Sequence, residues 1–112
     1  MDFTPAQIIG ELHRIQTEAS KGVQALYDAE CRLADAENTY ERELQLAFIQ
    51  AQGTVADRTA VSRLKAADAR LKADLAKAEW NRVKLKMKQL ELAQMSTQTI
   101  ARQVETELRV LR

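Results

Sequence analysis

Four basic side chains in the second half of the chain have the type and spacing best suited to binding chemistry. They are Arg82, Lys84, Lys86 and Lys88, which occupy every second position of the sequence. On a helix, which turns by about 100° per residue, they form two pairs spaced four residues apart, one on each side of an apolar strip. This basic strip suits the phosphates of a nucleic acid or the carboxylates of an acidic protein, and it is also typical of a solvated helix face.

Apolar side chains around the basic strip offer a second kind of contact. This set comprises Trp80, Leu85, Leu92 and Met95. We expect it to lie outside the helix face that carries Leu64, Leu71 and Leu75, and to form a wider apolar band that further helices would cover. The sequence therefore predicts that these four residues bind a protein partner. Trp80 could also stack on a nucleobase, although a single ring more often anchors packing.

His13 and Cys31 are the two residues with potential for metal, redox or nucleophilic chemistry. They are 18 residues apart in the sequence, which is about 27 Å along a continuous helix. There is no second His, no second Cys and no glycine-rich phosphate loop. We therefore predict that the chain is not an enzyme and has no metal or cofactor site. Cys31 is expected to be a buried or half-buried helix residue, with a covalent link between two protomers as the alternative.

The composition favours long helices over every other architecture. Of 112 residues, 46% are hydrophobic and 29% charged, and only three Gly and one Pro interrupt the sequence. This excludes a β-sandwich, and a single Cys excludes an internal disulfide. No apolar stretch is long enough to cross a bilayer and no secretory signal is recognisable, so we expect a cytoplasmic protein. The predicted fold class is all-α.

Local signals divide the chain into two helical arms. Thr4 and Gln7 form a capping-box pattern around Pro5, so the first arm is predicted over residues 5–52. Gly53 and Thr54 form the turn, because glycine readily closes a helix and threonine caps the next one. The second arm is predicted over residues 55–112, with a possible kink near residues 96–99. The whole chain, 1–112, is then a single antiparallel helical hairpin.

Apolar residues at steps of three and four predict the seam between the arms. In the first arm the stripe is Ile8, Leu12, Ile15, Ala19, Val23, Leu26, Ala29, Leu33, Ala36, Tyr40, Leu44 and Ala47. In the second arm it is Val61, Leu64, Ala67, Leu71, Leu75, Ala78, Val83, Met87, Leu90, Ala93 or Gln94, Ile100, Val104, Leu108 and Leu111. Residues 1–60 carry five basic and ten acidic side chains, whereas residues 61–112 carry twelve and six. The opposite net charges favour antiparallel packing of the arms.

Two helices bury too little apolar surface for a chain of this length, because much of the stripe is alanine. The sequence therefore predicts a homo-oligomer, with a dimer that forms a four-helix bundle as the leading arrangement.

The turn and the segment after the basic strip resemble features of a known class of proteins. The turn reads Gly53-Thr54-Val55-Ala56-Asp57-Arg58, and the later segment runs from Leu92 to Arg102. Both are similar to small helical-hairpin accessory proteins of tailed bacteriophages. The resemblance implies a phage protein made in the bacterial cytoplasm, and it assigns no functional residue. The WXG100 hairpins do not match, because their tryptophan lies in the turn and Trp80 does not.

Two functions remain open from the sequence. The first is a non-catalytic interaction module that binds another protein through Trp80, Leu85, Leu92 and Met95. The alternative is a nucleic-acid-binding accessory factor in phage replication or recombination that uses the basic strip.

Overall fold

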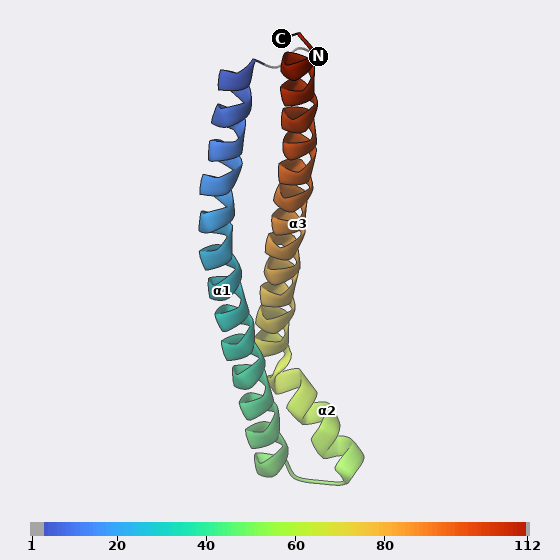
Figure 1. The fold of residues 1–112 in the computed structure, drawn as a ribbon. Helices are drawn as coiled ribbons and strands as arrows, with labels where there is room; N and C mark the ends of the chain where they lie inside the picture. The colour runs from blue at the N-terminus through green and yellow to red at the C-terminus, as the bar shows by residue number, and fades with distance from the viewer. Residues whose placement is uncertain (1–3, 112) are drawn as a thin grey trace. The chain divides into compact units, whose positions relative to one another are not determined.

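The computed structural model describes residues 4–111, and these residues form three helices and no strand. The helices are α1 (Pro5–Gln50), α2 (Val55–Lys65) and α3 (Ala67–Val110), shown in Figure 1. The all-α prediction is confirmed. Residues 1–3 and Arg112, which the predicted hairpin includes, lie outside the described residues.

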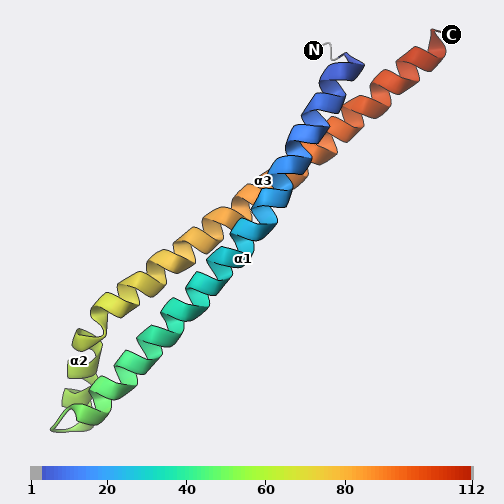
Figure 2. The ribbon, with the colours of Figure 1, turned by 90° about the vertical axis from the view of Figure 1, so that its left-hand side faces the viewer.

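The chain divides into two compact units, and α1 and α3 each contribute to both. Unit 1 consists of Met1–Ala25 and Val83–Arg112, and unit 2 consists of Leu26–Arg82. In unit 1 the first part of α1 lies beside the second part of α3 (Figure 1 and Figure 2). In unit 2 the rest of α1 packs on α2 and on the start of α3.

Helix α1 begins where the capping signal predicts. The backbone N–H of Thr4 donates to Gln7 Oε1 over 2.9 Å, and the backbone N–H of Gln7 donates to Thr4 Oγ1 over 3.2 Å. These two bonds satisfy amide groups that have no partner within the first turn of a helix. Pro5, the first helical residue, has no N–H to satisfy. The predicted start of the first arm is therefore confirmed.

The turn also forms at the predicted residues. Gly53 has a φ of 109°, in the left-handed region that favours glycine. Thr54 caps α2 by a reciprocal capping box with Asp57. The Arg58 guanidinium then donates two hydrogen bonds, of 3.1 and 3.0 Å, to the carbonyl oxygen of Phe48 near the end of α1. It also lies 4.4 Å from the centre of the Phe48 ring, so Arg58 ties α2 back to α1 by a cation–π contact as well.

The second arm is interrupted at Ala66, which the sequence did not indicate. Ala66 has φ −91° and ψ 4°, and its N–H still bonds to Ser62 O over 3.0 Å. The backbone bends at this point, and α2 departs from the line of α3 (Figure 1). Ala66 is fully buried and Ser62 nearly so. The kink that the sequence allows near residues 96–99 does not form, because α3 continues through these residues without interruption.

Alanines, not leucines, form the part of the unit 2 core that faces α1. Ala66, Ala69 and Ala73 are buried against a face of α1 that includes Ala29, Leu33 and Ala47. The predicted seam residues of the second arm are exposed instead: Val61, Leu64, Ala67, Leu71, Leu75 and Ala78. That part of the predicted stripe is wrong. Small side chains allow two helices to approach closely, so the alanine face takes the contact with α1.

Unit 1 follows the predicted seam more closely. Ile8 and Ile15 are buried, and Val83, Met87 and Leu90 are half-buried. The exceptions on the predicted stripe are Val23, Leu108 and Leu111, which are exposed. Gly22 takes the place of Val23 on the inner face, and a Cβ atom at this position would overlap the Met87 sulfur. Gly22 is therefore a packing position, where the absence of a side chain makes room for methionine.

We predict that Arg58→Ala destabilises the protein by about 1–3 kcal/mol, because it removes the hydrogen bonds to Phe48 and the cation–π contact. Urea denaturation followed by circular dichroism measures this change. Arg63→Ala is the matched control, since Arg63 is exposed on the same helix, and its effect should stay within about 0.5 kcal/mol. Equal stability of the two variants would contradict the role of Arg58.

Candidate partner-binding surface

The largest exposed apolar side chains of α3 in unit 2 lie opposite its contact with α1. Leu71 is two residues from both Ala69 and Ala73, which places it about 200° around the helix from each. Leu71 and Leu75 are 58% and 62% exposed, and Leu64 of α2 is 79% exposed. We call Leu64, Leu71 and Leu75 the leucine face. Nothing in the described residues covers it.

The predicted partner-binding residues divide between the two units. Leu85, Leu92 and Met95, in unit 1, are 59%, 57% and 56% exposed, as a partner-binding role requires. Leu85 and Leu92 follow Leu71 at steps of seven residues through Ala78, the spacing that keeps side chains on one face of a helix. They therefore share the heptad spacing of Leu71 along the sequence, within a separate unit.

Trp80, in unit 2, is half-buried and is held within its own unit. Its indole N–H donates to Glu30 Oε1 of α1 over 3.3 Å. This contact joins α3 to α1 fifty residues away in sequence. Trp80 thus contributes to packing inside unit 2, which is an ordinary use of an indole with a polar partner.

The basic strip also divides between the units. Arg82, in unit 2, makes an ion pair of 2.7 Å with Glu79 one turn earlier. The hydrogen bond from Arg82 lowers the pKa of the Glu79 carboxyl, and the positive charges of Arg82 and Arg32 act in the same direction. Lys84, Lys86 and Lys88 are exposed in unit 1. Part of the positive charge of the strip is therefore balanced within the chain.

His13 and Cys31 are both exposed, so the prediction of a buried or half-buried Cys31 is wrong. Cys31 is two residues from Ala29 and from Leu33, both buried, and this spacing turns its side chain away from α3. A side-chain hydrogen bond with Cys31 raises the pKa of the neighbouring Tyr27 hydroxyl. Within residues 4–111 no three His, Cys, Asp or Glu side chains are grouped as metal ligands would be. None of the described helices has the length and apolar character needed to span a bilayer.

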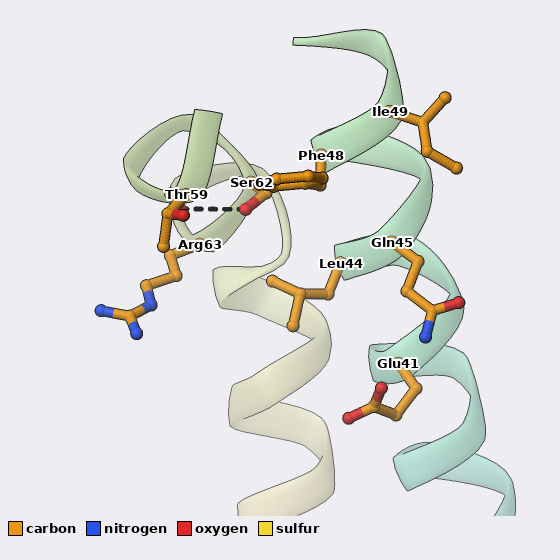
Figure 3. A pocket seen from close by; sticks show the side chains of 8 residues that line it. All are labelled: Glu41, Leu44, Gln45, Phe48, Ile49, Thr59, Ser62 and Arg63. Atoms are coloured by element: carbon orange, nitrogen blue, oxygen red, sulfur yellow. Dashed lines mark hydrogen bonds between the residues drawn. The ribbon is translucent and has the colours of Figure 1, made fainter. Parts of the chain in front are cut away.

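A groove of about 500 Å³ separates the end of α1 from α2 in unit 2 (Figure 3). Its lining residues are Glu41, Leu44, Gln45, Phe48, Ile49, Thr59, Ser62 and Arg63. The Ser62 hydroxyl donates to the Thr59 carbonyl oxygen over 2.9 Å, so it is engaged by the backbone. The groove exists because the chain bends at Ala66, and no sequence signal announced that bend. Its walls offer a mostly apolar surface.

We predict that Arg82→Gln raises the pKa of Glu79 towards the ordinary glutamate value, because the variant removes the charged hydrogen-bond donor. A pH titration of the side-chain carboxyl by NMR measures the shift. Arg70→Gln is the matched control, since its ion pair with Asp74 is long at 4.0 Å and does not involve Glu79. An unchanged Glu79 titration in Arg82→Gln would show that Arg82 is not engaged with it.

Comparisons with models of protein families, with curated proteins and with solved structures found no match for this chain. Function is therefore inferred from three features of the described residues: the outward-facing leucines, the exposed apolar residues of unit 1 and the basic strip.

Proposed function

We propose that this protein is a non-catalytic helical interaction module that dimerises into a four-helix bundle and binds another protein. The observation that carries the proposal is the outward direction of the leucines of α2 and α3, while alanines occupy the contact with α1. The resemblance of the turn and of the segment after the basic strip to tailed-phage hairpin proteins supports an accessory role of phage type in the bacterial cytoplasm.

The energetics of burial favour partners over an isolated chain. Burying a leucine side chain contributes about 1.5–3 kcal/mol, whereas an alanine offers much less apolar area. The chain uses alanines such as Ala69 and Ala73 in its own core and leaves Leu71 and Leu75 more than half exposed. A contiguous exposed apolar surface is typical of a protein-binding site. Binding a partner would bury the leucine surface that stays exposed when the chain folds alone.

Leu85, Leu92 and Met95 of unit 1 are the proposed contacts for the protein partner. Each is more than half exposed, and methionine adapts readily to the shape of a partner surface. Trp80 is proposed to support partner binding from unit 2, where its bond to Glu30 holds the ring in place. A helix that presents such residues at spacings of three and seven positions suits the side of another amphipathic helix.

We predict that the double variant Leu85→Lys, Leu92→Lys loses capture of its protein partner from host lysate by at least tenfold, because two apolar contacts become charged. Quantitative mass spectrometry of the captured proteins measures the loss. Val23→Lys is the matched control, since Val23 is also on unit 1 and is 62% exposed. Equal capture by the wild-type chain and the double variant would contradict the proposed site.

The nucleic-acid alternative predicts DNA binding that weakens as the salt concentration rises, whereas the proposed protein-binding function predicts none. We expect no saturable binding of a short DNA duplex at about 50 mM salt, because phosphate binding needs several unpaired cations and Arg82 is already paired with Glu79. Fluorescence anisotropy measures the affinity. Binding that weakens steeply with salt, and that disappears when Arg82, Lys84, Lys86 and Lys88 are all changed to Gln, would favour the alternative instead.

A further inference from the structure

We propose that the leucine face of unit 2 binds an acidic amphipathic helix of another protein. The proposal rests on the protein-binding function above and deepens it, because it names the chemistry of a partner and gives that partner its own surface. The surface is built on Leu64, Leu71 and Leu75, none of which is among the contacts proposed for unit 1.

Basic residues lie on both sides of two of these leucines. The sequence Arg-Leu-Lys occurs at residues 63–65 and again at residues 70–72, and we call these segments the two basic triplets. Neighbouring residues of a helix are about 100° apart around its axis, so each leucine has one base on either side of it. Flanking charges of this kind, beside an apolar residue, are what one helix uses to select an oppositely charged partner helix.

Both basic triplets are exposed in unit 2. Leu64 and Leu71 are 79% and 58% exposed, and the four bases beside them are exposed as well. Three of these bases form no ion pair with any described residue, and the fourth, Arg70, reaches Asp74 only at 4.0 Å. Most of the positive charge beside the leucines is therefore available to a partner.

The net charge of the segment favours an acidic partner over a second copy of the same face. Residues 63–77 carry five basic and two acidic side chains, a net charge of +3. Residues 26–50, the part of α1 in the same unit, carry two basic and six acidic side chains, a net charge of −4. An acidic helix is thus attracted to the leucine face and repelled by α1, whereas two leucine faces placed together would repel each other.

Two carboxylates near Leu71 favour a helix over an anionic membrane. Asp68 and Asp74 each lie three residues from Leu71, about 60° around the helix from it. Insertion of Leu71 into a bilayer would draw both carboxylates towards the hydrocarbon, which costs free energy. A partner helix can cover the leucine, place its own carboxylates beside the bases and leave these two at the rim. A nucleic acid that contacts only the bases would leave the leucines exposed to water.

Binding of a synthetic acidic helix to the full chain tests the proposal. The probe is a peptide of about three heptads with leucine at positions a and d and glutamate at e and g, and the matched peptide has lysine in place of glutamate. Fluorescence anisotropy measures binding. We expect saturable binding of the acidic peptide at about 50 mM salt, an affinity at least about tenfold lower at about 500 mM salt, and no binding of the basic peptide.

Reversal of the charges beside the leucines locates the site. In Arg63→Glu, Lys72→Glu we expect the affinity for the acidic peptide to fall at least about tenfold, and the preference to shift towards the basic peptide. Arg32→Glu, Arg42→Glu is the matched control, since both residues are exposed on α1 in the same unit and the change in net charge is equal. The control should stay within about threefold of the wild-type affinity.

A second variant, Leu71→Ala, keeps the test decisive if the charge-reversed chain fails to fold, and it should weaken binding of the acidic peptide by about tenfold or more. No binding of the acidic peptide by the wild-type chain would overturn the proposal. Equal losses in the two arginine and lysine double variants would do the same, as would tighter binding to phosphatidylserine vesicles than to the peptide.

The test also separates this proposal from the proposed function. Leu85→Lys, Leu92→Lys, which should lose the partner captured through unit 1, should keep its affinity for the acidic peptide within about threefold. Loss of the peptide in that variant alone would place the peptide on unit 1, which overturns the role of the leucine face and leaves the protein-binding function standing. A change of oligomeric state in Arg63→Glu, Lys72→Glu, measured by sedimentation velocity, would assign the face to contacts between copies instead.

Discussion

The close contact of Ala66 and of alanines in α3 with the inner face of α1 determines the arrangement of unit 2. Ala66, Ala69 and Ala73 have side chains small enough to allow the helices to approach, and each is almost fully buried. Because residues two positions away lie on the opposite side of a helix, this contact turns Leu71 and Leu75 outward. The exposed leucines are therefore a direct consequence of which side chains the helix contact accepts.

The turn makes this contact possible by bringing the helices together at a defined place. Gly53 closes α1, Thr54 and Asp57 begin α2, and Arg58 binds the carbonyl oxygen of Phe48. The bend at Ala66 then redirects the chain from α2 into α3 and leaves a groove beside the end of α1. Further along, Trp80 bonds to Glu30 and so maintains the same antiparallel pairing.

A chain that buries alanines and exposes leucines gains little apolar burial from its own core. Burial scales with apolar area, and Leu64, Leu71 and Leu75 each remain more than half exposed. This balance fits an interaction module. The described residues contain no cluster of metal ligands, and the Ser62 hydroxyl at the groove donates to the Thr59 carbonyl oxygen.

The sequence alone determined the features that depend on neighbouring residues. The capping boxes at Thr4 and Thr54 and the left-handed Gly53 were predictable, because their hydrogen bonds and backbone angles involve residues only three or four positions apart. The exposed Leu85, Leu92 and Met95 were also identified in this way. The tertiary structure decided which face of α3 packs inward, since its alanines and its leucines both recur at helical spacing and periodicity cannot rank them. It also decided the bend at Ala66, the exposure of Cys31 and the pairing of Trp80 with Glu30, because each depends on contacts between segments distant in sequence.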